Sequence, residues 1–323
     1  MDRVELRELS YFVAVAEELH FGRAAERLGI AQPPLSRAII KLEQHLGVTL
    51  LTRTSRSVAL TAAGETLLHE ARKALDAAAA AVRRACRAGE VKPRLPVAMK
   101  PGGDSGLLPR ILATYRGEEA AVPVEILVCG VGEQASWLRE GKADAAFLHL
   151  PYDDASGFDT EPLVEEPQVV VLPREHALAG NSALSVEDLR DEPAPRWPGM
   201  PADRTTGPLV RDSGQLMQLI ALGQAVAVLP ASVSAHLHPD LVAVPVPDAP
   251  HTTTVMAWPE RSRSLAVAAF VRAAARAGKE RAVGGPTAPT WPSEATVGGP
   301  TGAVSREAAR YASASPSAAS SVE

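Results

Sequence analysis

A chain of 323 residues with 46% hydrophobic side chains is long enough for two or more packed domains. Its formal net charge of −5 excludes a protein that is basic along its whole length, such as a histone-like protein, but it does not exclude a locally basic domain. No apolar run reaches the length of a membrane span, the N-terminus lacks a signal-peptide core, and Cys86 and Cys129 form no metal or disulfide pattern, so we expect a cytoplasmic protein without a membrane partner.

Residues 1–61 are predicted to fold as three helices followed by two short β segments. The first helix is indicated by apolar residues that recur at helical spacing on one face: Leu6, Leu9, Val13 and Ala16. A second, short helix covers residues 21–28 and ends at Gly29, where a left-handed residue can close a helix. A third helix begins near Pro33, because proline is tolerated in the first helical turn.

The third helix has two unlike faces. Its core face is predicted to carry apolar residues, namely Leu35, Ile39, Leu42 and Leu46. Its opposite face carries polar and cationic residues, namely Ser36, Arg37, Lys41 and Gln44. A generic three-helix bundle explains the leucines, but the tight turn and the cationic outer face are typical of a helix-turn-helix whose third helix enters the major groove. Arginine and glutamine can each make paired hydrogen bonds to base edges there.

A β-ribbon with arginines at its tip is predicted to follow the third helix. Two β-like pieces, 49–51 and 57–60, flank the segment Arg53-Thr54-Ser55-Arg56. As in a wing, these arginines can reach phosphates or a minor groove. The chain from Arg27 to Arg56 holds five cations against one anion, Glu43, so this region is predicted to be positively charged.

The whole region resembles the N-terminal domain of LysR-type transcriptional regulators. The matching stretches are Leu9-Ser10-Tyr11-Phe12-Val13-Ala14-Val15-Ala16-Glu17-Glu18, Ala24-Ala25-Glu26-Arg27-Leu28, Gln32-Pro33-Pro34-Leu35-Ser36-Arg37, Leu42-Glu43, Leu46-Gly47 and Leu60-Thr61 with Gly64. The resemblance implies a winged helix-turn-helix that regulates transcription at a palindromic site in double-stranded DNA, and not an enzyme. The expected DNA contacts are Phe21, Arg23, Gln32, Pro33, Pro34, Ser36, Arg37, Lys41, Arg53 and Arg56.

Residues 62–90 are predicted to form a linker helix. Apolar residues repeat along it with heptad spacing: Leu68, Ala71, Leu75, Ala78, Val82 and Ala85. An ordinary amphipathic helix packed on its own domain is the alternative interpretation. Because the equivalent helix of LysR-type regulators pairs with its copy in a second subunit, the resemblance implies a homodimer or a homotetramer.

Between residues 91 and 280, β-rich runs alternate with helical stretches, which predicts an α/β fold with ligands at the carboxyl ends of strands. The stretch Gly130-Val131-Gly132-Glu133-Gln134-Ala135 matches the dinucleotide fingerprint, so a nucleotide-dependent enzyme is the alternative function, although the following helix is short. The stretch Gly103-Asp104-Ser105-Gly106 is similar to a protease nucleophile loop but has no matching histidine segment. Three histidines lack the partners that a metal site needs: His236, His238 and His251.

The same region resembles the effector-binding domain of LysR-type regulators, which is similar to type 2 periplasmic binding proteins. The matching stretches are Leu107-Leu108-Pro109, Leu138-Arg139-Glu140-Gly141-Lys142-Ala143-Asp144-Ala145-Ala146 and Ala225-Val226-Ala227-Val228-Leu229-Pro230. The resemblance implies lobe I at 91–161 and 239–280 and lobe II at 162–238, with crossings near 161–166 and 232–240. It also implies a small-molecule effector between the lobes, with no other cofactor and no metal. The expected effector contacts are Lys100, Asp104, Ser105, Glu133, Gln134, His149, Ser213 and Gln215.

Residues 281–323 are rich in small and polar side chains and are predicted to be a disordered tail. The stretch from Pro198 to Pro208 is shorter than in the family, which implies a trimmed lobe II. The predicted fold class is therefore multidomain: an all-α winged helix-turn-helix domain, a linker helix and a two-lobed α/β effector-binding domain. The effector, the target genes and the direction of regulation stay open.

Overall fold

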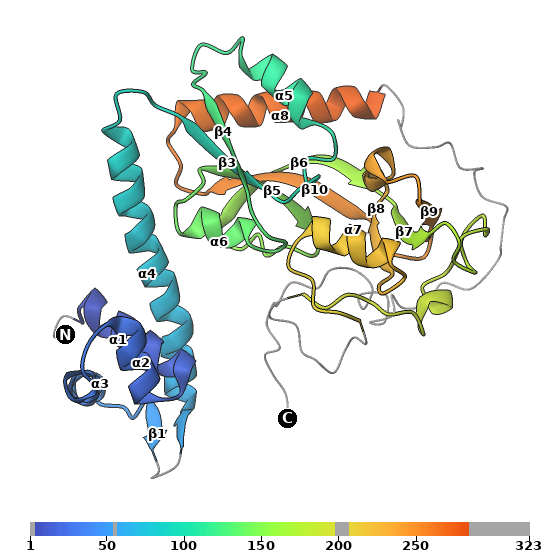
Figure 1. The fold of residues 1–323 in the computed structure, drawn as a ribbon. Helices are drawn as coiled ribbons and strands as arrows, with labels where there is room; N and C mark the ends of the chain where they lie inside the picture. Colours follow the sequence, from blue (N-terminus) through green and yellow to red (C-terminus); the bar gives the residue numbers. More distant parts are fainter. Residues whose placement is uncertain (1–3, 54–56, 198–206, 284–323) are drawn as a thin grey trace, which may run out of the picture. The chain divides into compact units, whose positions relative to one another are not determined.

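The computed structural model describes residues 4–53, 57–197 and 207–283, and the chain divides into two compact units. One unit holds the residues up to Glu90 together with Arg139–Gly141, and the other holds Val91–Leu138 and the chain from Lys142 onward. Helices make up most of the first unit, and the second combines strands with helices (Figure 1). Each unit has its own hydrophobic core.

The first unit contains the three predicted helices and the predicted β-ribbon. Its elements are α1 (Leu6–Glu18), α2 (Phe21–Leu28), α3 (Gln32–Leu46), β1 (Leu51–Arg53), β2 (Val58–Leu60) and α4 (Ala62–Ala88). Gly29 ends α2 and Gly47 ends α3, with φ values of 66° and 68°. Glycine adopts this left-handed backbone without the steric cost of a Cβ atom, so both turns are encoded locally.

The core of the first unit forms where α1, α3 and the start of the ribbon meet. Its largest fully buried side chains are Phe12, Leu35, Ile39, Leu42 and Leu50. Leu46 was predicted on the same face of α3 but is 39% exposed. It is the last residue of α3, and the chain turns away at Gly47.

Helix α4 is 27 residues long, and the last two positions of its predicted heptad seam, Val82 and Ala85, are exposed. The Thr61 hydroxyl accepts a hydrogen bond from the Gly64 amide at 3.0 Å and so caps the helix start. Ala71 is buried where α1 packs on α4. In contrast, the Val82 side chain is 64% exposed. The packing of α1 therefore uses only the first part of the seam.

The second unit contains two β-sheets. The larger sheet has the order β4-β3-β5-β10-β6, in which β3 runs parallel to β4 and β5, and β10 runs antiparallel to β5 and β6. The smaller sheet has the order β8-β7-β9 and is antiparallel throughout. The bounds are β3 (Leu95–Met99), α5 (Leu108–Tyr115), β4 (Val124–Val128), α6 (Gln134–Arg139), β5 (Ala145–Leu150), β6 (Phe158–Glu166), β7 (Gln168–Pro173), η1 (Glu187–Leu189), α7 (Ser213–Ala221), β8 (Ala227–Pro230), η3 (Ala231–His236), β9 (Leu241–Pro245), β10 (Thr252–Pro259) and α8 (Leu265–Val283).

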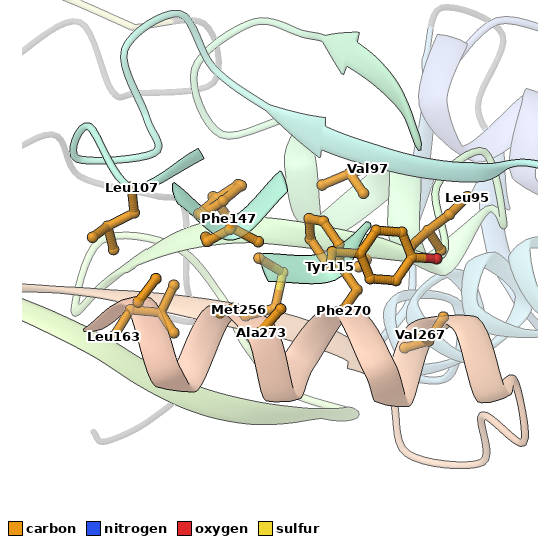
Figure 2. Packing of buried hydrophobic residues seen from close by; sticks show 14 of the residues in the cluster. Leu95, Val97, Leu107, Tyr115, Phe147, Leu163, Met256, Val267, Phe270 and Ala273 are labelled. Carbon is orange, nitrogen blue, oxygen red and sulfur yellow. The ribbon is translucent and has the colours of Figure 1, made fainter. Parts of the chain in front are cut away.

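Both faces of the larger sheet are packed. Tyr115 of α5 and Phe270 of α8 meet edge to face, with ring centroids 5.3 Å apart, over Phe147 of the sheet (Figure 2). The next residue along β5, Leu148, belongs to a different cluster that includes Leu138 of α6. Successive residues of a strand point to opposite faces, so β5 contributes to two cores. Helices on both faces leave the strand ends as the place for a site.

The division into lobes differs from the sequence prediction at two strands. No strand was predicted at residues 158–166, where β6 forms the edge of the larger sheet. Edge strands accept prolines and charges such as those of β6, which hide its pattern. Strand β9 pairs with β7, so residues 241–245 belong to the smaller sheet and the predicted boundary at 239 is wrong. The chain passes between the sheets at Pro167 and again between β9 and β10.

Helix α8 continues to Val283, which corrects the predicted start of the tail at residue 281. Its last turn is anchored by Arg281, which donates a hydrogen bond to Glu166 Oε1 at 3.0 Å. Residues 284–323 of the predicted tail and most of the shortened stretch, 198–206, lie outside the described residues. Among the helices that are described, none is long and apolar enough to cross a membrane.

Candidate functional sites

The outer face of α3 presents most of the polar residues that the sequence analysis selected. Arg37 makes no ion pair with any other residue that the structure describes, so its guanidinium is free to bind a partner. Two prolines lie in the first turn of the helix. Ser36 is half-buried, and the exposed residues are Gln32, Pro33, Pro34, Arg37 and Lys41.

Other cations near α3 are paired within the unit. Arg27 Nη1 lies 2.7 Å from Glu17 Oε2, and this pairing raises the pKa of Arg27. Two of the predicted DNA contacts are also paired, Arg23 with Glu18 and Lys41 with Glu8. The positive charge predicted for residues 27–56 is therefore offset by carboxylates of α1, which lie outside that segment of sequence.

Glu43 is a structural residue that the sequence analysis counted only as an anion. Its Oε1 accepts hydrogen bonds from the backbone amides of Leu50 and Leu51 at 2.9 and 3.1 Å, and its Oε2 lies 3.0 Å from Arg53 Nη2. The Arg53 guanidinium also lies 4.8 Å from the centroid of the Phe21 ring. Glu43 thus ties the ribbon to α3, and Arg53 turns toward its own unit. Arg56 lies outside the described residues.

In the second unit, polar groups gather at the carboxyl ends of three adjacent strands. Lys100 follows β3, the Glu133–Gln134 turn comes shortly after β4, and His149 lies near the end of β5. The order β4-β3-β5 and the parallel pairing place these ends beside one another. The Gln134 side chain is fully buried, and neither its amide nitrogen nor its oxygen has a hydrogen-bond partner among the described residues.

His149 lies in a cluster of ionisable side chains with Asp153 and Lys100. The ring is 2% exposed, and its Nδ1 lies 3.6 Å from Asp153 Oδ2, too far for a hydrogen bond. That carboxylate oxygen instead accepts the His149 backbone amide at 2.7 Å. Burial and the charge of Lys100 lower the pKa of His149 to about 4, so its ring is neutral near pH 7.

The pKa values of the ionisable residues around His149 depend on the charges of their neighbours. Burial lowers the pKa of Lys100, although the Asp153 carboxylate opposes this effect. Burial raises the pKa of Asp153, but the approach of His149 and the charge of Lys100 outweigh it and leave the pKa below its ordinary value. Burial, Glu133 and Asp153 raise the pKa of the Cys129 thiol to about 12, so Cys129 stays protonated.

Three of the predicted effector contacts, Asp104, Glu133 and Gln215, already accept hydrogen bonds from the chain. Asp104 accepts the Leu108 amide at 3.0 Å, and Glu133 accepts the Gly130 amide at 2.8 Å. On α7, the Gln215 side chain accepts the Arg211 amide at 2.9 Å, and Ser213 is the first residue of that helix. Of the eight residues, the structure brings Lys100, Glu133, Gln134 and His149 to one edge.

Ser105 belongs to a buried hydrogen-bond network instead of lining an open site. Its hydroxyl donates to Glu166 Oε2 at 3.0 Å and lies 2.8 Å from the Thr254 hydroxyl. Glu166 is 4% exposed and also accepts from Ser232 at 2.9 Å and from Arg281. Because Ser232 follows β8 of the smaller sheet and Glu166 ends β6 of the larger one, this network joins the two sheets. The sequence gives no local signal for it.

Comparison with known proteins identifies the family. Residues 6–65 match the model described as "Bacterial regulatory helix-turn-helix protein, lysR family", and residues 88–279 match the model described as "LysR substrate binding domain". The chain belongs to the LysR family. It is a LysR-type transcriptional regulator with an effector-binding domain, which confirms the resemblance seen in the sequence.

Two relatives and one solved structure illustrate this membership of the LysR family. The transcriptional regulator AlsR of Bacillus subtilis is 41% identical over 191 residues, which span 59% of this chain and 63% of AlsR. The Hca operon transcriptional activator HcaR of Escherichia coli is 31% identical over 285 residues, which span 83% of this chain and 96% of HcaR. The crystal structure of CbnR, a LysR family transcriptional regulator, matches with a TM-score of 0.53 and 25% identity over 85% of this chain and 99% of CbnR.

The geometry of the loop after β4 argues against the alternative function, a nucleotide-dependent enzyme. The Glu133 carboxylate already accepts the Gly130 amide, which a pyrophosphate would need. Helix α6, which follows, has only six residues. The known relatives are transcriptional regulators, in agreement with a non-enzymatic role.

Proposed function

We propose that this LysR-type regulator binds double-stranded DNA through the outer face of α3 and acts in the cytoplasm as a homodimer or homotetramer. The observation that carries the proposal is the guanidinium of Arg37, which forms no ion pair with the described residues and lies on an exposed face whose opposite side packs the core. The ten predicted DNA contacts fall into two groups. The proposed base contacts are Arg37, Gln32 and Ser36. The other seven residues are proposed to contact the DNA backbone or to support α3.

Assembly through α4 is part of the proposal. The second half of α4 exposes an apolar position, Val82, at 64%, and a second copy of the same helix would cover it. A two-fold pair of recognition helices matches a palindromic site. This geometry makes recognition depend on two half-sites.

We further propose that a small-molecule effector binds at the carboxyl edge of the larger sheet, between the two sheets. The loop after β4 approaches the segment before α7, a helix that contacts β7 of the smaller sheet: a Cβ atom added to Gly130 would lie 3.4 Å from the carbonyl oxygen of Arg211. A ligand held by both sheets would favour one arrangement of the lobes and so shift the equilibrium of the regulator.

The proposal is tested with Arg37→Ala and the DNA upstream of the protein's own gene. We expect binding to weaken by about 1–3 kcal/mol, which is roughly tenfold to more than a hundredfold, with unchanged thermal stability. Arg116→Ala in the second unit removes an equal charge from an exposed site and is the matched control. Equal affinities of Arg37→Ala and the wild-type protein in an electrophoretic shift assay would refute the assignment of Arg37.

A further inference from the structure

The base of the ribbon formed by β1 and β2 is held from two sides through the backbone of Leu50. The Leu50 amide donates to Glu43 Oε1 of α3 at 2.9 Å, and its carbonyl oxygen accepts the Thr61 amide at 3.0 Å. The same carbonyl packs against Gly64 of α4, where an added Cβ atom would collide with it. Because the Leu50 side chain is also 1% exposed, the base of the ribbon cannot shift without losing these contacts.

Arg53, the last residue of β1, connects the outer part of the ribbon to two helices. Its Nη2 donates to Glu43 Oε2 of α3 at 3.0 Å, and its guanidinium lies 4.8 Å from the centroid of the Phe21 ring at the start of α2. Arg53 is paired with Val58, so β2 is held together with β1. A charge-assisted hydrogen bond and a cation over an aromatic face both favour this one position of the guanidinium.

The charge of Arg53 is compensated within its own unit. The Arg53 side chain is 30% exposed, whereas that of Lys41 on the outer face of α3 is 75% exposed. A phosphate that approached Arg53 would also approach the Glu43 carboxylate, which repels it. Arg37, in contrast, forms no ion pair with the described residues. The two arginines are therefore placed for different tasks.

We propose that Arg53 is a positioning residue, which with Glu43 and Phe21 fixes the ribbon against α2 and α3 and does not itself neutralise a phosphate. The recognition helix and the ribbon then meet the DNA at a set spacing. A ribbon that is already fixed loses little conformational freedom when DNA binds, and in this way the three residues contribute to affinity. The inference rests on the proposed function, because it takes α3 to be the recognition helix.

The test is Glu43→Gln, for which a positioning residue and a phosphate contact predict opposite results. The glutamine oxygen can still accept the amides of Leu50 and Leu51, whereas the NH2 group replaces the oxygen that faces Arg53. If Arg53 contacted a phosphate, loss of the nearby negative charge would strengthen binding. If Arg53 positions the ribbon, binding to the DNA upstream of the protein's own gene should weaken by about tenfold.

The matched control is Glu26→Gln, which removes an equal charge from an exposed position of α2. This variant should bind DNA at least as tightly as the wild-type protein. If Glu43→Gln binds as tightly as Glu26→Gln does, the inference is wrong.

Arg53→Gln and the double variant complete a mutant cycle. Each single variant should lose the same affinity, and the double variant should lose no more than either, because all three release the same ribbon. Footprinting of the sugar–phosphate backbone should show that protection beside α3 is kept and protection by the ribbon is lost, which a general loss of folding would not produce. Additive losses, or an even loss of protection along the site, would overturn the proposal.

Arg37→Ala separates this inference from the proposed function. Equal DNA affinities of Arg37→Ala and the wild-type protein would count against α3 as the recognition helix, whatever the result for Glu43→Gln. Weaker binding by Arg37→Ala together with unchanged binding by Glu43→Gln would leave the proposed function standing and refute the role of Arg53.

Discussion

The outer face of α3 and the carboxyl edge of the larger sheet are both candidate recognition surfaces, but they are built in opposite ways. On α3 the selected side chains reach solvent, and the fold depends on the other face of the helix. At the sheet edge, Gln134 and His149 are inside the protein, where an unsatisfied polar atom affects stability. Substitutions on the exposed face of α3 should therefore leave the fold intact, whereas substitutions of the buried polar groups at the sheet edge should change stability.

This contrast leads to substitutions that should separate binding from stability. Changes in the buried network of the second unit should destabilise the protein most, and changes on the face of α3 should affect only DNA binding. An exposed residue of α3 whose replacement unfolded the protein would contradict this contrast between the two surfaces.

The largest effect is expected for Glu166→Ala. Glu166 accepts hydrogen bonds from Ser105, Ser232 and Arg281, and removing one partner of a buried ion pair costs about 3–5 kcal/mol. Chemical denaturation followed by circular dichroism would measure the loss. The neighbouring Glu165 pairs with His251 at the surface and is 66% exposed, so Glu165→Ala should cost little by comparison. Equal losses for the two variants would contradict the proposed role of the network.

The second-largest effect is expected for the pH dependence of stability, through the titration of His149. Because the pKa of the folded ring is about 4 and its ordinary value is 6.5, the unfolded chain takes up the proton first, and stability falls as the pH drops through this range. Between about pH 7 and about pH 5 the loss should be about 2 kcal/mol. The lowered pKa of Asp153 acts only at still lower pH. His149→Gln should flatten the dependence measured by denaturation at several pH values, and an unchanged slope would refute the assignment.

A smaller effect is expected for Glu43→Ala. The substitution leaves the amides of Leu50 and Leu51 without their acceptor and frees Arg53, so we expect a loss of about 1–2 kcal/mol in the unfolding of the first unit. Gln44→Ala, at the exposed neighbouring position, serves as the control. A thermal melt that does not distinguish the two variants would show that Glu43 does not hold the ribbon.

The smallest change in stability is expected for Lys41→Ala. The Lys41 side chain is 75% exposed and lies 3.7 Å from the Glu8 carboxylate, a long contact whose energy is weakened by the solvent around the lysine. If Lys41 contacts a phosphate, the variant should bind all DNA sequences more weakly, and the slope of log affinity against log salt concentration should fall by about 1. An unchanged slope in binding titrations over a range of salt concentrations would remove Lys41 from the DNA contacts.

The sequence alone predicted the first unit well because its signals are local. Gly29 ends α2 at the expected place, prolines start α3, and the apolar spacing along α3 selects three residues that are fully buried, Leu35, Ile39 and Leu42. Helical periodicity and turn chemistry depend on neighbours within a few residues, and the family resemblance follows from the same stretches. The selection of Arg37 as an exposed polar residue needed nothing more.

The pairing of residues that are distant in the sequence follows from the tertiary structure alone. This structure assigns β9 to the smaller sheet, places β6 at an edge, and brings Glu166 to Arg281. It also places carboxylates of α1 beside the cations near α3, and it buries the Gln134 side chain with no hydrogen-bond partner among the described residues. Strand pairing and burial bring together residues that are far apart in the chain. Local sequence patterns depend on near neighbours and therefore do not predict such partners.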